Sequence, residues 1–99
     1  MEWIPGRSES FAKTITEADV STFAGVVGDF NPAHLDAEYA RQSRLGRRTA
    51  HSMLAGGMIF SLLYNRLPGP GAVCMNLSLE FLAPIYIGDT LRVTVEVAA

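Results

Sequence analysis

The residues best suited to chemistry lie close together in the first third of the chain. Asp29 and His34 are separated by a short stretch that contains the dipeptide Asn31-Pro32. Proline fixes its own φ and keeps the preceding residue out of the helical region, so this dipeptide favours a turn. A turn can bring the carboxylate and the imidazole to one side of the loop, where one would act as a general base and the other as a general acid. The same residues also suit a plain surface turn with no role in a reaction.

This loop begins a longer series of motifs. Residues 28–36 read GDFNPAHLD, and residues 49–54 read TAHSML. Their order and spacing resemble the signature of MaoC-like (R)-specific enoyl-CoA hydratases and dehydratases, in which G-D-x-N-P-x-H-x-D is followed by A-H-G-M-L. The resemblance continues through Ser61, LPG at residues 67–69 and FLAPIYIGD at residues 81–89, and it covers the chain from about residue 11 to residue 97.

The resemblance implies both a fold and a reaction. The fold is an α+β hot-dog, a curved antiparallel sheet wrapped round a long central helix at about residues 52–67, with residues 1–99 as a single domain. The reaction is the addition of water to a trans-2-enoyl thioester of coenzyme A or a carrier protein, giving an (R)-3-hydroxyacyl thioester, or the reverse dehydration. Asp29 and His34 would share the acid and base roles around one water, and which residue takes which role stays open. A homodimer is also implied.

The motif match assigns supporting roles to four further residues. The backbone amide of Ser52 or Met53, at the start of the central helix, would stabilise the developing enolate oxygen. Ser52 departs from the family, which usually has glycine there, so its side chain would either crowd the thioester or cap the helix. Asn31 would orient the loop or His34, or simply form the turn. Ser61 matches a serine near the family's active site, or alternatively bonds back to its own helix.

The segments before the loop are expected to hold it in place. Residues 10–15 alternate apolar and polar side chains, which is typical of a short half-buried strand. Thr16 and Asp19 then stand at the spacing of a helix capping box. Gly28 is expected to end this helix in a left-handed conformation, so that Asp29 emerges directly from the helix C-terminus. Four apolar residues at helical spacing predict its buried face: Val20, Phe23, Ala24 and Val27.

A basic cluster follows the loop. Asp36 is predicted to cap a short helix over residues 37–42, with Gly46 ending it. Four arginines surround the end of this helix: Arg41, Arg44, Arg47 and Arg48. Such a cluster suits a solvated surface near a helix C-terminus. Alternatively, Arg47 and Arg48 bind the phosphates of coenzyme A, because guanidinium groups bind phosphate well.

The longest apolar stretch is predicted to be a buried helix. Residues 52–67 are apolar nearly all round until Asn65, and they fall short of the ~20 residues that a membrane-spanning helix needs. Gly56 and Gly57 cost about 1 kcal/mol each inside a helix relative to alanine, which indicates that something approaches the backbone closely there. Packing against a sheet or a partner chain would explain this, and so would a slot for the acyl chain.

Two long strands are predicted after the helix. Residues 72–82 alternate, with Cys74 on the polar face as an unreactive thiol. Residues 91–97 alternate again, and the turn at residues 88–89 is expected to join the two strands as an antiparallel hairpin. The apolar face of the first strand is formed by five residues: Val73, Met75, Leu77, Leu79 and Phe81.

The hot-dog fold normally carries about two more strands than this sequence supplies. We therefore expect the domain to be C-terminally incomplete, as a fragment or a shortened gene product. Its central helix would be partly uncovered and one sheet edge unpaired, which favours association with another chain.

Composition excludes several classes of function. The chain has 99 residues, 48% hydrophobic and 18% charged, with a net charge of −2 and no basic run, so nucleic acid is not an expected partner. One cysteine and no visible signal peptide are typical of a cytoplasmic protein. With only two histidines and one cysteine, the sequence has no metal-ligand cluster at a recognised spacing. His51 is expected to be structural rather than catalytic. No cofactor is expected apart from the coenzyme A of the substrate, and no membrane contact.

Two other functions remain open on the same fold. A hot-dog thioesterase is the competing enzyme, although the Asp-x-Asn-Pro-x-His arrangement favours the hydratase. A non-catalytic subunit that binds acyl groups or serves dimerisation is the competitor from another class, and Ser52 and the early chain end both favour it.

Overall fold

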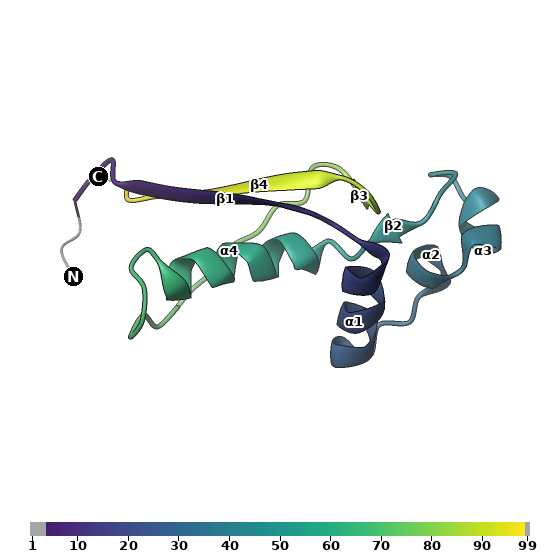
Figure 1. Cartoon of the computed structure of the whole chain (residues 1–99), viewed down its shortest axis with the longest axis horizontal. Coiled ribbons are helices and arrows are strands. Elements are labelled where there is room, and N and C mark those ends of the chain that lie inside the picture. The colour runs from purple at the N-terminus through teal and green to yellow at the C-terminus, as the bar shows by residue number, and fades with distance from the viewer. Residues whose placement is uncertain (1–3, 99) are drawn as a thin grey trace.

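The computed structural model describes residues 4–98 as a long helix lying against a two-stranded sheet, with three short helices at one end (Figure 1). The molecule is elongated, with extents of 50 × 22 × 22 Å. The strands are β1 (Ser8–Thr14), β2 (Thr49–Ala50), β3 (Ile85–Tyr86) and β4 (Thr90–Glu96). The helices are α1 (Glu17–Val27), α2 (Pro32–Leu35), α3 (Ala37–Arg41) and α4 (Met53–Asn65).

The main sheet joins the two ends of the described chain. β1 and β4 run antiparallel, from the pair Ser8 and Glu96 to the pair Thr14 and Thr90. This confirms a strand near residues 10–15 and another near residues 91–97. The predicted hairpin between residues 72–82 and 91–97 is wrong, because β4 pairs with the distant β1 instead. A second small antiparallel pair joins β2 to β3.

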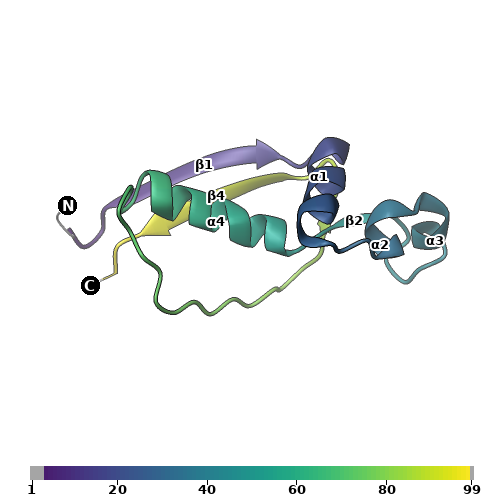
Figure 2. The same cartoon turned by 90° about the horizontal axis from the view of Figure 1, so that it is seen from below.

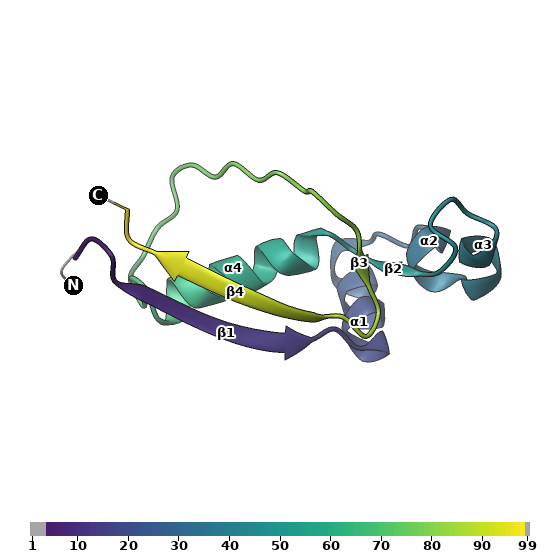
Figure 3. The same ribbon diagram turned by 90° about the horizontal axis from the view of Figure 1, so that it is seen from above.

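The predicted strand at residues 72–82 is also wrong. These residues form no strand ladder; they run as an extended segment that arches past α4, apart from β4 (Figures 2 and 3). Val73, Met75 and Leu82 are 77%, 83% and 85% exposed. An extended segment becomes a strand only when a neighbour satisfies its backbone groups, and within residues 4–98 no strand lies beside it.

The hydrophobic core lies between α4, the main sheet and α1. Burying a large aliphatic side chain contributes about 1.5–3 kcal/mol. The helix α4 buries Gly56, Met58 and Leu62 and exposes Met53 and Tyr64, so the predicted burial holds on one face only, and the helix is partly uncovered as expected. A two-stranded sheet covers one side of α4, and the extended segment that follows the helix covers another side only in part, at Gly56 and Tyr64. The core cluster consists of Ile15, Val20, Ala50, Met58, Leu62 and Val93.

The helix α1 forms as its sequence predicts. Thr16 and Asp19 make both bonds of the capping box, and Gly28 ends the helix with φ 78°. Val20 and Ala24 are buried. Val27 is 54% exposed, which corrects its predicted burial, because the last turn of α1 borders an open hollow instead of the core.

None of the helices within residues 4–98 is both long enough and apolar enough to cross a membrane. The predicted irregular lead-in over residues 1–9 falls partly on residues 1–3, which lie outside the described residues, and β1 begins at Ser8, inside the remainder.

Candidate active site

The loop after α1 is shaped by its own polar side chains. The Asp29 carboxylate accepts a hydrogen bond from the Asn31 backbone N–H at 3.2 Å. The Asn31 side chain in turn accepts from the Ala33 N–H at 2.9 Å and caps α2. Pro32 follows at the first helical position, where its missing N–H costs nothing. The predicted turn is therefore one turn of helix, and Asn31 orients the loop.

His34 is held in one tautomer by a backbone carbonyl. Its Nδ1 lies 2.7 Å from the Thr49 carbonyl oxygen. A carbonyl only accepts hydrogen bonds, so Nδ1 carries the proton, and in the neutral ring Nε2 has a free lone pair. That Nε2 lies 4.0 Å from Oδ2 of Asp29. The structure thus brings the two predicted catalytic residues together, too far apart for a direct hydrogen bond.

Arg48 connects the loop to α1. Its guanidinium makes two bonds of 2.8 Å to the Glu17 carboxylate, and its Nε donates to the His34 carbonyl at 2.7 Å. This planar fork is the geometry in which arginine binds carboxylates most specifically. All three guanidinium nitrogens of Arg48 therefore have partners inside the chain, which does not suit the predicted role in binding phosphate.

The other arginines of the basic cluster lie nearer the surface. Arg41 pairs with Glu38 on α3. Arg47 lies over the ring of Tyr86, 3.8 Å from its centre, in a cation–π contact. Of the two arginines predicted to bind coenzyme A, only Arg47 retains a geometry compatible with that prediction.

His51 belongs to the site, although the sequence pointed only to a structural role. It is 3% exposed, and its ring stacks on that of His34 at 3.9 Å between centroids. Its Nε2 lies 3.0 Å from the Asp29 carbonyl oxygen and 4.0 Å from Asp29 Oδ2. The signal for this role was the A-H pair of the second motif, but nothing in the sequence placed it beside Asp29.

The same three residues form a candidate metal group that the sequence spacing did not predict. Ligand atoms of Asp29, His34 and His51 lie within 4.8 Å of one another. However, the contact between His51 Nε2 and the Asp29 carbonyl requires an N–H, which leaves no lone pair there for a metal. The arrangement is better suited to proton transfer.

An apolar hollow of about 540 Å³ opens beside these residues. Gly57 borders it, and a Cβ there would meet nothing within 4 Å, so this glycine leaves room for a ligand. Gly56 is buried, and a Cβ there would lie 3.0 Å from the Met53 side chain and 3.5 Å from Leu79. Close packing therefore explains the glycine at position 56, and open space for an acyl chain is compatible with the glycine at position 57. The lining residues are Phe23, Val27, Asp29, His34, His51, Ser52, Met53, Gly57 and Phe60.

The start of α4 faces the same hollow. The amides of Leu54 and Ala55 donate back to the carbonyls of His51 and Ser52. Within residues 4–98, the Ser52 and Met53 amides have no acceptor, as expected of the first N–H groups of a helix. Ser52 makes no side-chain cap, so the suggestion that it caps α4 is wrong. Its half-buried side chain lies at the wall of the hollow.

Ser61 lies outside this hollow. It borders a neighbouring hollow of about 280 Å³, which shares Phe23 and Gly57 with the first. The Ser61 carbonyl accepts a hydrogen bond from the Asn65 side chain at 2.8 Å. The structure does not bring Ser61 together with Asp29 and His34.

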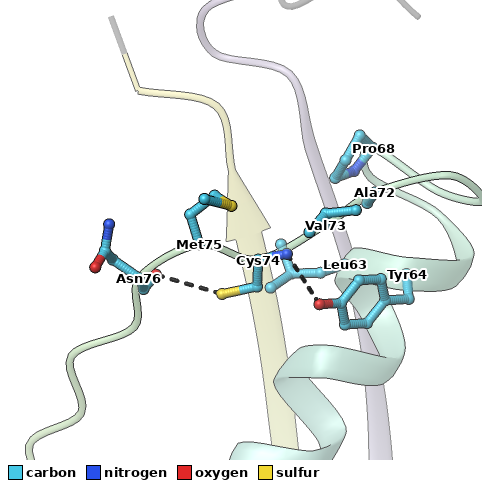
Figure 4. A pocket seen from close by; sticks show the side chains of 8 residues that line it. All are labelled: Leu63, Tyr64, Pro68, Ala72, Val73, Cys74, Met75 and Asn76. Carbon is cyan, nitrogen blue, oxygen red and sulfur yellow. Dashed lines mark hydrogen bonds between the residues drawn. The ribbon is translucent and has the colours of Figure 1, made fainter.

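A third hollow, of about 260 Å³, lies at the other end of α4 (Figure 4). The Cys74 N–H donates to the Tyr64 hydroxyl at 3.1 Å, which fixes the start of the extended segment to the helix. The exposed Cys74 thiol donates to the Asn76 carbonyl at 3.3 Å. This hollow has no acid–base pair of the kind found beside Asp29.

The chain resembles known proteins over nearly its whole length. Residues 4–99 match the family model of the MaoC like domain. The chain is 51% identical over 92 residues to the (R)-specific enoyl-CoA hydratase of Rhodospirillum rubrum, and 45% identical over 93 residues to the 3-hydroxybutyryl-CoA dehydratase of Methylorubrum extorquens. These matches cover 93% and 94% of this chain, but only 64% and 59% of the two relatives, so the chain spans about three fifths of their length.

Solved structures show the same architecture. An (R)-hydratase from Aeromonas caviae superposes with a TM-score of 0.93 at 35% identity, over 97% of this chain and 73% of that protein. An R-hydratase from Pseudomonas aeruginosa gives a TM-score of 0.92 at 40% identity, over 97% of this chain and 62% of that protein. The fold is therefore the hot-dog fold that the sequence motifs predicted. Its motifs, its structure and its relatives agree, and the chain belongs to the family of MaoC-like domains.

Proposed function

We propose that this chain carries the catalytic site of a hydratase that adds water to a trans-2-enoyl thioester, giving an (R)-3-hydroxyacyl thioester, or that runs the reverse dehydration. One observation carries the proposal: the Asp29 carboxylate and the free lone pair of His34 face each other across 4.0 Å beside an apolar hollow. Relatives named (R)-specific enoyl-CoA hydratase and 3-hydroxybutyryl-CoA dehydratase support it.

The gap between Asp29 and His34 suits one bridging water, because polar groups too far apart for direct bonding are commonly joined in this way. As the water oxygen bonds to Cβ of the substrate, the pair accepts one water proton. It then returns one proton to Cα, so that both residues end in the state in which they began. Hydrogen and hydroxyl are thereby added on the side of the substrate that faces the pair.

The start of α4 would stabilise the charge that develops during this reaction. Adding hydroxide to Cβ moves electrons toward the thioester oxygen, and the unbonded amides of Ser52 and Met53 are suitable donors for it. We place the acyl chain in the hollow beside Gly57, whose missing side chain leaves space there. The reaction moves protons and no electrons to an acceptor, so it calls for no cofactor beyond the coenzyme A of the substrate.

The direct test is loss of the conjugated absorbance of crotonyl-CoA. We expect turnover by the wild type and a loss of about 10²–10⁴-fold in kcat in both Asp29→Asn and His34→Ala, the usual contribution of general acid–base catalysis. Glu80→Gln, an exposed acid away from the pair, serves as the control and should retain activity. A cooperatively folded wild type that leaves the substrate unchanged, or that only releases free coenzyme A, would contradict the proposal.

We also propose that the chain works as a homodimer. The exposed apolar side chains of the extended segment, Val73, Met75 and Leu82 among them, form a surface of the kind that proteins usually cover. Sedimentation velocity should show a dimer at micromolar concentration. A monomer over the whole range in which the protein is active would disprove this part.

A further inference from the structure

We propose that His51 is a positioning residue, which holds both Asp29 and His34 in place without itself exchanging protons with the substrate. This inference rests on the proposed hydratase function. A second imidazole, nearly fully buried, lies against both reacting side chains, and the proposed reaction gives it no role.

The hydrogen bond to Asp29 fixes the tautomer of His51. Because the Asp29 carbonyl at 3.0 Å can only accept, Nε2 of His51 carries the proton. Nδ1 is buried and has no hydrogen-bond partner within residues 4–98. A proton on Nδ1 would leave a buried N–H without an acceptor, which is unfavourable. The two histidines of the site therefore carry their protons on opposite nitrogens.

This tautomer removes His51 from the acid–base chemistry. Its proton on Nε2 is used by the backbone of Asp29, and the carboxylate oxygen is 4.0 Å away. Its lone pair is on Nδ1, which is buried and lies on a different side of the ring from Nε2. The ring can thus support its neighbours but has neither a free proton nor an accessible lone pair to offer the substrate.

The support acts on both reacting residues at once. The hydrogen bond from His51 Nε2 restrains the backbone of Asp29. This residue directly follows the left-handed Gly28, and its side chain is half-exposed. The ring stacks on His34 at 3.9 Å on one side and contacts Phe23, 4.9 Å away between centroids, on another. His51 is itself anchored at the start of α4, because the Leu54 amide donates to its carbonyl. It therefore links α1, the loop that carries Asp29 and His34, and α4.

Three substitutions separate the two contacts. His51→Gln keeps an N–H donor at similar reach but loses the ring. His51→Phe keeps a ring that can stack but loses the donor, and His51→Ala loses both. Because a misplacement of about 1 Å can cost about 10²-fold in rate, we expect His51→Ala to lose about that much in kcat. KM should change much less than kcat, because the side chain lost is only one of the several that line the hollow. Gln and Phe should each restore part of the loss.

The control is Tyr64→Phe, at the opposite end of α4 (Figure 4), which should keep kcat and KM. Circular dichroism melts establish that each variant is folded; if His51→Ala does not fold, the Gln and Phe variants decide. A full kcat in both of them would overturn the proposal. So would a rise in KM with constant kcat, because His51 would then affect substrate binding alone.

A second measurement does not depend on activity. Long-range ¹H–¹⁵N spectra of the imidazole rings should show the proton on Nδ1 in His34 and on Nε2 in His51. Finding His51 protonated on Nδ1 would overturn the inference. If the wild type is inert but the two tautomers are as expected, the hydratase proposal fails while the positioning of His34 and Asp29 by His51 stands.

Discussion

Neighbouring residues on α4 serve different purposes. Gly56 is buried against Met53 and Leu79, and a side chain there would require the end of the Met53 side chain to shift slightly. Gly57 opens onto the hollow beside Asp29. The cost of two adjacent glycines in a helix is thus explained by two separate needs, close packing and space for a ligand. Ser52 does not cap the helix with its side chain, and it lies at the wall of that hollow.

Asp19 provides a pH-dependent contribution to stability. Its hydrogen bond from Lys13, together with the capping bond from the Thr16 N–H, lowers its pKa from 3.8 to about 2. A carboxylate whose pKa is lower in the folded state stabilises the fold above its unfolded pKa, and this contribution is lost as the pH falls from about 4 toward about 2.

We therefore predict that Asp19→Asn lowers the free energy of unfolding at pH 7 and flattens its dependence on pH in that acidic window. Urea titrations of both proteins from pH 2 to pH 7 measure this. Parallel curves for the two proteins would show that Asp19 has no such role.

At the scale of elements, the site depends on how α1 and the loop that carries Asp29 and His34 are joined. Arg48 bonds the Glu17 carboxylate on α1 and the His34 carbonyl on α2, so it positions the loop. Arg47, by contrast, lies over Tyr86 on β3. The sequence grouped these two residues as one cluster, and the structure assigns them different surroundings.

This difference predicts distinct kinetic effects. Arg48→Lys cannot reproduce the planar fork, so we expect kcat to fall equally on acyl-CoA and acyl-pantetheine substrates. Arg47→Ala should raise KM for acyl-CoA alone if it binds a phosphate of the coenzyme. Steady-state kinetics with both substrates measures these effects. An equal rise in KM for both substrates in Arg47→Ala would refute the phosphate contact.

Local signals in the sequence predicted the elements around the site well. The capping box of Thr16 and Asp19, the glycine stop at Gly28 and the Asp36 cap all act over a few residues, and each is present in the structure. The proximity of Asp29 to His34 followed from the turn between them. The contact with His51 did not, since it joins two residues that lie 22 positions apart in the chain and depends on the tertiary fold.

At the scale of the whole molecule, the failed predictions are those of distant pairing. Residues 72–82 have the alternation typical of a strand. A strand also needs a neighbouring strand to pair with, and the alternation does not indicate which segment that is. The sequence pattern favours pairing residues 91–97 with the neighbouring residues 72–82, yet β4 pairs with β1, at the other end of the chain. The consequence is an apolar extended segment and a helix covered on one side, which together leave a large surface for association.

If Asp29 and His34 act from one side of the substrate on a single water, hydrogen and hydroxyl are added to the same face. Hydration of crotonyl thioester in D₂O, followed by NMR analysis of the product, tests this. We expect a single diastereomer, with deuterium at Cα and hydroxyl at Cβ added to the same face and an (R) configuration at Cβ. Addition to opposite faces, or a mixture of diastereomers, would contradict it.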